Sequence, residues 1–313
     1  MVSPTPSRHA LASRRADFAT VPEAIEYAAR GETGLNFYSG KGELTEALPY
    51  RQMYEQGIAL AKRMLAKGLV KGDRVAIIAE SDGDFMRAFT ACQFAGLVPA
   101  PLPLPAAFGG KEAYIDHIRR MMQGAAAAAV LSPASLADWV KAAADGLDMK
   151  AVGTLSVFDD VDGAGVTLPT VGPDDLCYLQ FSSGSTRFPL GVAVTQKALM
   201  ANAYAITHYG LKITAADRCV SWLPLYHDMG LVGFLLTPLV CQVSIDYLPT
   251  REFARRPLLW LNLITRNGGT LSYSPSFGYE LAARRAETAS TEGIDLSTWR
   301  GAGIGGDMVR PRV

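Results

Sequence analysis

The sequence predicts an α/β fold made of two packed α/β subdomains with mostly parallel sheets. Short apolar runs that suit buried strands alternate with amphipathic, helix-like segments along most of the chain. Strands separated by helical crossovers form parallel sheets that helices cover on both faces. The sequence offers about nine strand candidates, which is more than one open sheet usually contains, and this favours two subdomains.

The first half of the chain shows the alternation most clearly. Met53, Gly57, Leu60, Ala61 and Met64 share one helical face, and the turn after them leads into an apolar run. The predicted elements that follow are a strand at Val75–Ala79, a helix through Phe85, Phe89 and Cys92 ending at Gly96, a strand and extended loop at Leu97–Pro105, a helix at Glu112–Gln123, a strand at Ala127–Leu131 and a helix at Ala134–Ala144.

The second half continues the pattern after a polar interruption. The stretch Asp159–Asp175, which contains VDGAG and VGPDD, is the best internal boundary. Further strand candidates are Cys177–Phe181, Cys219–Leu223, Val243–Leu248 and Thr270–Tyr273. We therefore expect a loose tail at residues 1–20, a first α/β subdomain at 21–170 and a second at 171–313.

Composition excludes several classes of function. The 313 residues include 30 Lys+Arg and 30 Asp+Glu, so the formal net charge is zero, whereas nucleic acids and anionic membranes select excess positive charge. Four widely spaced cysteines form no CxxC pair, which predicts free thiols and no metal site. The most apolar stretch, Met229–Cys241, is shorter than the roughly 20 residues that span a bilayer. With no secretory signal visible at the start of the chain, we expect no nucleic-acid partner, no integral membrane segment and a cytoplasmic location.

One loop carries most of the functional information. Residues Ser182–Gly191 read SSGSTRFPLG and follow the predicted strand Cys177–Phe181. Hydroxyls, backbone N–H groups and unbulky glycines are what a polyphosphate site needs, although ordinary Ser/Gly turns have the same composition. The spacing of a Walker A loop is absent.

Three ordered motifs resemble those of the acyl-adenylate-forming superfamily, which includes acyl-CoA synthetases and peptide-synthetase adenylation domains. They are LQFSSGSTRFPLG at Leu179–Gly191, WLPLYHDMGL at Trp222–Leu231 and GIGGDMV at Gly303–Val309. Upstream, KGDRVA at Lys71–Ala76 and AGLVP at Ala95–Pro99 are also similar to this superfamily. The resemblance covers nearly the whole chain after the tail and implies that superfamily's large N-terminal domain.

The departures from the usual pattern resemble fatty acyl-AMP ligases. The common loop has Gly and, after Pro, Lys, where this chain has Arg187 and Leu190. Arg187 would then restore charge near the phosphates that the missing lysine would have served. The resemblance implies ATP-dependent activation of a fatty acid with Mg²⁺, and transfer of the acyl group to the phosphopantetheine arm of an acyl carrier protein.

The resemblance also implies roles for individual residues. Arg187 and His227 would be catalytic, with His227 near the α-phosphate and the fatty-acid carboxylate; a histidine packed at a strand-to-helix turn is the alternative. Asp228 is expected to cap the helix that follows rather than to act as an acid. The expected phosphate-binding residues are Ser182, Ser183, Gly184, Ser185, Thr186 and Gly191, and the expected adenine-side residues are Gly305, Gly306 and Asp307.

The acyl chain needs an apolar tunnel, for which the resemblance offers candidates. These are Met229, Gly230, Leu231, Phe234, Ser274 and Phe277. For any one of them, ordinary core packing of a helix is the competing interpretation.

Later elements of the superfamily have no counterpart up to Val313: the next adenylation motif, the carboxylate for the ribose hydroxyls, and the C-terminal domain with its lysine. We therefore expect a fragment of a longer enzyme, with little activity by itself. Two alternatives stay open: a fragment of a long-chain acyl-CoA synthetase, and a non-catalytic nucleotide- or acyl-binding module.

Overall fold

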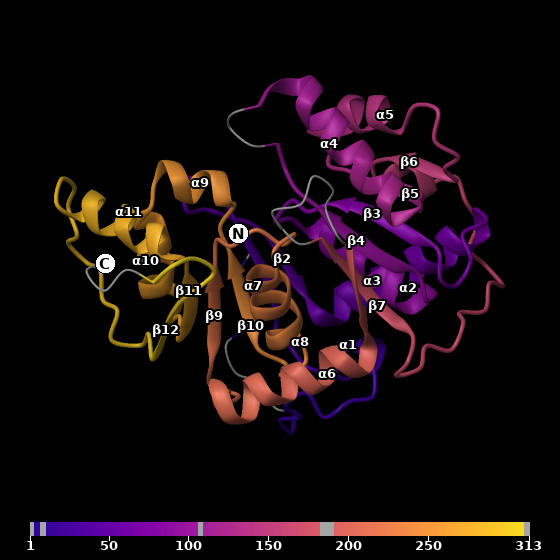
Figure 1. Ribbon diagram of the computed structural model, residues 1–313. Helices are drawn as coiled ribbons and strands as arrows, with labels where there is room; N and C mark the ends of the chain where they lie inside the picture. Colours follow the sequence, from indigo (N-terminus) through magenta and orange to yellow (C-terminus); the bar gives the residue numbers. More distant parts are fainter. Residues whose placement is uncertain (1–2, 7–10, 106–108, 182–190, 310–313) are drawn as a thin grey trace. The chain divides into compact units, whose positions relative to one another are not determined.

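The computed structural model describes residues 3–6, 11–105, 109–181 and 191–309. The chain divides into two compact units (Figure 1). Unit 1 comprises Met1–Asp17, Tyr27–Arg51 and Ala203–Val313, and unit 2 comprises Phe18–Glu26 and Gln52–Asn202. The fold is α/β with mostly parallel sheets, as the sequence predicts. The units draw on interleaved segments, which differs from the expected consecutive division at residue 170.

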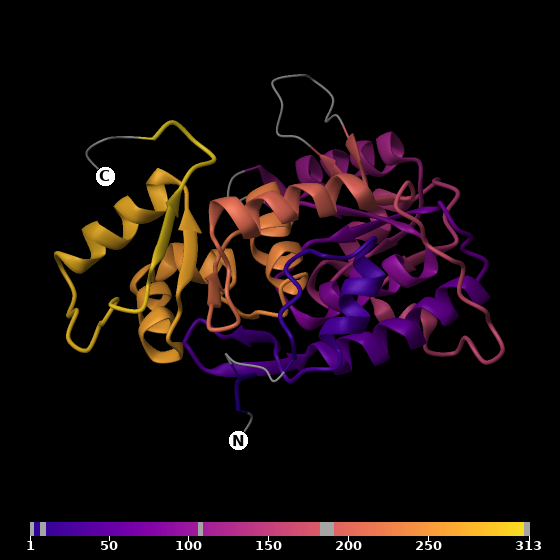
Figure 2. The ribbon, with the colours of Figure 1, turned by 90° about the horizontal axis from the view of Figure 1, so that it is seen from below.

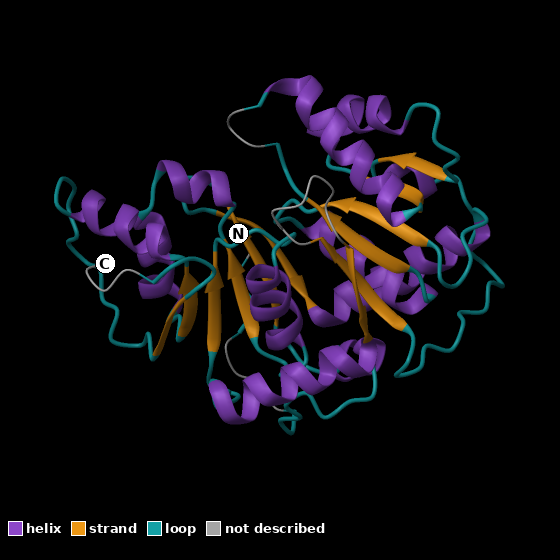
Figure 3. Cartoon of the chain, in the orientation of Figure 1, coloured by secondary structure: helices purple, strands orange, loops and turns teal. Residues whose placement is uncertain are grey.

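Unit 1 contains a sheet of six strands, of which only the edge strand β2 is antiparallel to its neighbour (Figure 3). Its order is β12 (Gly301–Ile304), β11 (Leu271–Ser274), β9 (Arg218–Ser221), β10 (Ser244–Tyr247), β1 (Gly34–Tyr38) and β2 (Leu44–Pro49). The pairing of β1 with β10 joins residues about two hundred positions apart. This pairing is why an N-terminal segment belongs to the same unit as the last third of the chain.

The helices of unit 1 follow its strands. They are the π-helical turn η3 (Ile206–Gly210), α7 (Asp228–Leu231), the π-helical turn η4 (Val232–Leu236), α8 (Thr237–Leu239), α9 (Thr250–Arg255), α10 (Leu258–Asn267) and α11 (Ser276–Ala286). Three further helices run across the division between the units: α1 (Val21–Ala28), α2 (Tyr50–Ala66) and α6 (Gln196–Ala205). Figure 2 shows β11 and β12 side by side with α11 near them.

Unit 2 contains a parallel sheet of four strands and a separate antiparallel hairpin. The sheet order is β4 (Val98–Leu102), β3 (Arg74–Ile78), β5 (Ala127–Leu131) and β6 (Ala151–Gly153), and the hairpin is β7 (Leu176–Phe181) with β8 (Gly191–Thr195). Its helical segments are α3 (Gly83–Ala95), α4 (Gly110–Ala125), η1 (Ala134–Leu136), α5 (Ala137–Ala144) and η2 (Leu155–Phe158). Their apolar faces bury residues such as Ile118, Met122 and Val140 against the sheet.

Most predicted elements of the first half are confirmed within one to three residues. Asp82 caps α3 by accepting a hydrogen bond from the N–H of Phe85, and Gly96 ends the helix with a φ of 64°. That left-handed conformation is one that glycine adopts without strain. In the second half, Cys177–Phe181 is a strand as predicted, but it pairs with β8, which the sequence analysis missed.

The described part of the N-terminal tail is packed rather than loose. The N–H of Thr5 donates to Asn36 Oδ1 at 2.8 Å, and the Thr5 carbonyl accepts from the buried guanidinium of Arg218 at 2.7 Å. The N–H of Ala16 donates to the Val240 carbonyl at 2.9 Å. A buried guanidinium needs acceptors for all its N–H groups, and this segment supplies one.

Candidate functional site

The predicted residues of unit 1 gather at one edge of its sheet. Strands β9, β11 and β12 run parallel, so their carboxyl ends lie at the same edge (Figure 1). Beyond these ends come Trp222–Leu231, the start of α11 and the loop Gly305–Asp307. Open parallel sheets characteristically bind ligands at this edge.

His227 lies at the start of α7 with an exposed side chain. Its carbonyl accepts the hydrogen bond of the Leu231 N–H at 2.8 Å, and its own N–H donates to the Pro224 carbonyl at 3.2 Å. The ring of Tyr226 lies 5.1 Å away, centroid to centroid. Backbone bonds therefore hold His227 in place and leave its imidazole presented at the surface of unit 1.

Asp228 is not the cap that the sequence analysis expected. His227 is the N-cap residue, with extended backbone, and Asp228 is the first helical residue. The Asp228 carboxylate accepts a hydrogen bond from the adjacent Met229 N–H at 2.7 Å. A carboxylate in the first turn still interacts favourably with the helix N-terminus.

Gly230 is required by packing. A Cβ at this position would lie 2.2 Å from the Pro224 carbonyl oxygen. Helix α7 therefore packs directly on the backbone of the segment that precedes it. Core packing, the competing interpretation, therefore explains this glycine without any acyl ligand.

The other acyl candidates of this helix divide by burial. Leu231 and Phe234 are 0% and 3% exposed, whereas Met229 is half-buried. Phe234 lies edge-on to Tyr273 of β11, with ring centroids 5.5 Å apart. In this structure Leu231 and Phe234 belong to the core, and Met229 is the most exposed of these three candidates.

The candidates after β11 also differ. Ser274 is fully buried and its hydroxyl donates to the Pro275 carbonyl at 2.8 Å. Phe277 is 48% exposed, and its ring lies edge-on to that of the buried Trp222 at 5.8 Å. An exposed aromatic side chain beside the site can contact an apolar ligand, whereas Ser274 is already paired.

The loop Gly305–Asp307 lies next to the segment that contains His227. Gly306 has a φ of +79°, which favours glycine, and a Cβ there would lie 3.3 Å from Met229 Cε. The Gly305 N–H donates to the Ser274 carbonyl at 3.3 Å. Two acyl candidates, Met229 and Ser274, are thus neighbours of the adenine-side candidates Gly306 and Gly305, respectively.

The carboxylate of Asp307 is bonded within the protein. Asp307 Oδ1 accepts from the N–H of Ser276 at 3.1 Å and from its hydroxyl at 3.0 Å. The Ser276 hydroxyl also lies 3.3 Å from the Met308 carbonyl. Asp307 therefore joins the loop after β12 to the start of α11.

Tyr273 and Gly303 form a pair that the sequence analysis did not single out. They face each other across β11 and β12, and a Cβ on Gly303 would lie 2.4 Å from the Tyr273 ring. Tyr279 donates to the Gly303 carbonyl at 2.8 Å, and burial raises the pKa of Tyr279 to about 12, so its hydroxyl remains a donor at neutral pH. Glycines alternating along Gly301–Gly303 were the available signal for such close packing.

Most of the phosphate-binding candidates fall outside the described residues. Residues Ser182–Thr186, together with Arg187, are outside the described residues. Gly191, expected to close the loop, is the exposed first residue of β8 in unit 2. The hairpin itself is held by Gln93, whose amide donates to the carbonyl of the bulged residue Cys177 at 2.7 Å.

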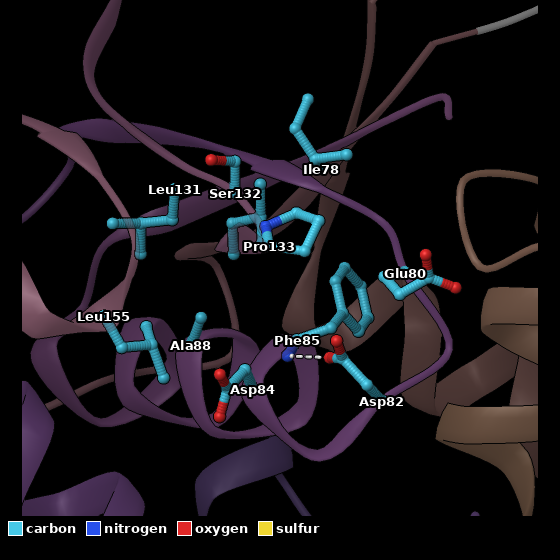
Figure 4. A pocket seen from close by; sticks show the side chains of 11 residues that line it. Ile78, Glu80, Asp82, Asp84, Phe85, Ala88, Leu131, Ser132, Pro133 and Leu155 are labelled. Atoms are coloured by element: carbon cyan, nitrogen blue, oxygen red, sulfur yellow. Dashed lines mark hydrogen bonds between the residues drawn. The ribbon is translucent and has the colours of Figure 1, made fainter. Parts of the chain in front are cut away.

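Unit 2 has a small hollow of its own (Figure 4). It lies at the carboxyl ends of β3 and β5, between Ile78 and Leu131, and contains none of the predicted site residues. The carboxylate of Asp82 at its rim is used to cap α3, and Asp84 pairs with Arg87 at 3.2 Å. Asp82 and Asp84 thus have structural roles.

Two absences hold for the residues that the structure describes. They contain no group of three or more His, Cys, Asp and Glu side chains arranged to hold a metal ion. No helix among them has the length and apolarity needed to cross a membrane. The described cysteines are all buried and unbridged.

The chain belongs to the AMP-binding enzyme family, whose model matches residues 27–313. A protein of Caulobacter vibrioides named putative acyl-CoA synthetase is 54% identical over 310 residues, which are 99% of this chain and 54% of that protein.

Solved structures agree with this family. One from a study of fatty acyl-adenylate ligases of E. coli and L. pneumophila superposes with a TM-score of 0.91 at 44% identity, covering 96% of this chain and 54% of that one. A fatty acyl-adenylate ligase of L. pneumophila, in complex with acyl adenylate and pyrophosphate, gives a TM-score of 0.84 at 26% identity, covering 94% of this chain and 50% of that one. The chain thus spans about half the length of these relatives.

Proposed function

We propose that the protein activates a fatty acid with ATP, forming an acyl-adenylate and releasing pyrophosphate. A carboxylate oxygen attacks the α-phosphorus, and the bond from that phosphorus to the β-phosphate oxygen breaks. The observation that carries the proposal is the convergence of His227, Met229 and the loop Gly305–Asp307 at the carboxyl edge of the unit 1 sheet. The family match and the L. pneumophila complex with acyl adenylate support it.

The reaction brings two anions together, so the protein must position them and offset their charge. We assign the exposed imidazole of His227 to an oxygen of the α-phosphate or of the carboxylate. The expected phosphate-binding residues, Ser182 to Thr186 with Gly191, would hold the polyphosphate. Arg187 would supply the cation that Leu190 cannot.

Mg²⁺ is proposed to arrive on the phosphates of ATP. This ion commonly binds through one or two carboxylates together with substrate phosphates, rather than in a cage made by the protein alone. The ion would offset phosphate charge there.

We propose that the adenine base and the acyl chain of the acyl-adenylate lie on opposite sides of Met229. Gly305 and Gly306 carry no side chain and leave room for a flat base, with Asp307 fixing the loop by its bonds to Ser276. Met229 and Phe277 are the accessible apolar candidates for the acyl chain, while Gly230, Leu231, Phe234 and Ser274 would support them from the interior.

A pyrophosphate-release assay on the complete gene product tests this proposal. Each member of a panel of fatty acids should stimulate pyrophosphate release in the presence of ATP and Mg²⁺, whereas amino acids and aryl acids should not. The chain of residues 1–313 alone should turn over little, since we propose that it is the N-terminal part of the enzyme. ATP binding without carboxylate-dependent turnover by the complete product would support a non-catalytic binding module.

We further propose that the acyl group passes to an acyl carrier protein. The likeness to fatty acyl-adenylate ligases favours this acceptor, whereas the name of the C. vibrioides relative favours coenzyme A. Supplying labelled fatty acid, ATP and either holo carrier protein or free coenzyme A separates the two. Thioester formed mainly on the carrier protein supports the proposal, and efficient acyl-CoA formation supports an acyl-CoA synthetase.

A further inference from the structure

The helix that starts at His227 contains an irregularity close to the acyl candidates. After α7 the chain forms the π-helical turn η4 and then the short helix α8, which contains Pro238. The N–H of Thr237 donates to the Val232 carbonyl, five residues back. Single π-helical turns within α-helices occur frequently at functional sites.

Pro238 removes one backbone donor from this helix. In an α-helix the N–H of residue 238 would donate to the carbonyl of residue 234, but proline has no N–H. That carbonyl belongs to Phe234, one of the acyl candidates, and the residue is buried. A buried carbonyl that loses its helical donor requires another partner.

The hydroxyl of Tyr247 is that partner. Tyr247 Oη donates to the Phe234 carbonyl at 2.6 Å. Tyr247 is the last residue of β10, opposite Ser221 at the end of β9, and is 1% exposed. Its ring stacks on Phe37, with centroids 5.5 Å apart, so the position of the hydroxyl is fixed by the sheet.

The contact continues toward the adenine side. The Phe234 ring lies against Tyr273, and the Tyr273 ring covers Gly303, two residues before Gly305. A shift of Phe234 would therefore alter packing on both sides of the candidate site. Burial also raises the pKa of Tyr247 well above its usual value, so the hydroxyl stays a donor throughout the working pH range.

We propose that Tyr247 is a positioning residue, whose hydroxyl replaces the N–H missing at Pro238 and so sets the register of the helix that carries the acyl-binding side chains. The inference rests on the proposed function for its consequence, which is that the buried Phe234 supports Met229 in its position toward the fatty acid. It extends that function by naming a residue outside the three motifs.

The test compares Tyr247→Phe with Tyr50→Phe in the complete gene product. Tyr50 is the matched control, because its buried hydroxyl also donates to a backbone carbonyl of unit 1, that of Val243 at 2.7 Å, and not to a carbonyl of η4. Tyr247→Phe should raise the KM for fatty acid by roughly threefold to tenfold and shift the preferred chain length, with the KM for ATP nearly unchanged. Tyr50→Phe should lower the Tm without changing the chain-length profile. Identical profiles for the two variants would overturn the proposal.

Pro238→Ala provides the rescue. This substitution restores an N–H that can donate to the Phe234 carbonyl, so the double variant Tyr247→Phe with Pro238→Ala should recover the wild-type KM and chain-length profile. If Tyr247→Phe does not fold, the double variant decides: folded protein with the wild-type profile supports the proposal. An unfolded double variant, beside a folded Pro238→Ala protein, rejects it.

A failure of the proposed function would be recognised separately. Wild-type protein that releases no pyrophosphate with any fatty acid contradicts fatty-acid activation. Wild type, Tyr247→Phe, Pro238→Ala and the double variant then still report on the hydrogen bond through their free energies of unfolding. Tyr247→Phe should cost less stability in the Pro238→Ala background than in wild type, and equal costs would reject the role of the hydroxyl.

Discussion

Asp307, in the loop after β12, caps helix α11, which follows β11. Its Oδ1 accepts hydrogen bonds from the N–H and the hydroxyl of Ser276. Pro275, the N-cap residue of that helix, has no side chain able to do so. The side chain expected to face adenine is therefore also the one that fixes the loop.

Substitutions of Asp307 distinguish these two roles. Asp307→Ala should lose about 1 kcal/mol of stability, the usual value of a helix cap, and raise the KM for ATP. Asp307→Asn keeps an oxygen acceptor for Ser276 and should behave almost as wild type in thermal unfolding and in ATP titrations. Equal loss of ATP use in both variants would show that the charge acts on the nucleotide directly.

His227 should be replaceable without loss of stability. The contacts that hold it are backbone bonds to Pro224 and Leu231, so His227→Ala leaves them intact. Adenylate formation should nevertheless fall by about a hundredfold, the lower range for a positioned acid–base group. His208→Ala is the control: His208 of η3 stacks on Tyr204 of α6, outside the site, and its loss should leave the rate unchanged. An unaltered rate in His227→Ala would remove His227 from the mechanism.

Gly230 and Gly233 offer a matched pair for the packing of the helix. Gly230→Ala places a methyl group against the Pro224 carbonyl and should destabilise by about 1–3 kcal/mol. At Gly233 an added Cβ meets nothing within 4 Å, so Gly233→Ala should leave stability unchanged or raise it. Urea unfolding measures both. A neutral Gly230→Ala variant would mean that α7 does not pack as described.

Arg187 is predicted to serve ATP rather than the fatty acid. Arg187→Ala should weaken ATP use by roughly tenfold to a hundredfold, because a charge-assisted bond to phosphate is lost. The KM for fatty acid should change much less. Arg285→Ala, at an exposed position near the end of α11, serves as the control for loss of a positive charge. Equal effects on both substrates, or none, would make Arg187 an ordinary surface residue.

Acid should weaken unit 1 through Asp217. Burial by itself raises the pKa of this carboxyl, but hydrogen bonds from Arg300, Thr270 and the Thr214 N–H outweigh burial and lower it. Because the pKa of this carboxyl is lower in the folded state, its charge stabilises the fold at pH values above the unfolded-state pKa of about 3.9. This stabilisation is lost as the pH falls through the folded-state pKa. The stability difference between wild type and Asp217→Asn should therefore be constant near neutral pH and shrink below about pH 4. Urea unfolding across pH measures it, and a constant difference would contradict the role of the charge.

Local signals explain what the sequence analysis predicted well. The helix ended by Gly96 and the buried strand Ala127–Leu131 depend on a cap and on an apolar run, which are properties of neighbouring residues. The predicted strand at Cys219–Leu223 is also present, as β9, and the motif around His227 follows its carboxyl end. Strand β8 carries no clear sequence signal, because it begins at the last glycine of the Ser/Gly-rich loop and most of the strand's residues are exposed.

By itself the sequence determined the α/β class, most helices and strands, and the three motifs that identify the family. Only the tertiary structure decided which of those residues meet: β1 beside β10, Asp307 on Ser276, and Tyr247 on the carbonyl of Phe234. Periodicity shows that a side chain or strand is buried, but not which distant partner it finds. Buried polar groups must be paired and buried surfaces must fit closely, and these two requirements select the partners only when the whole unit folds.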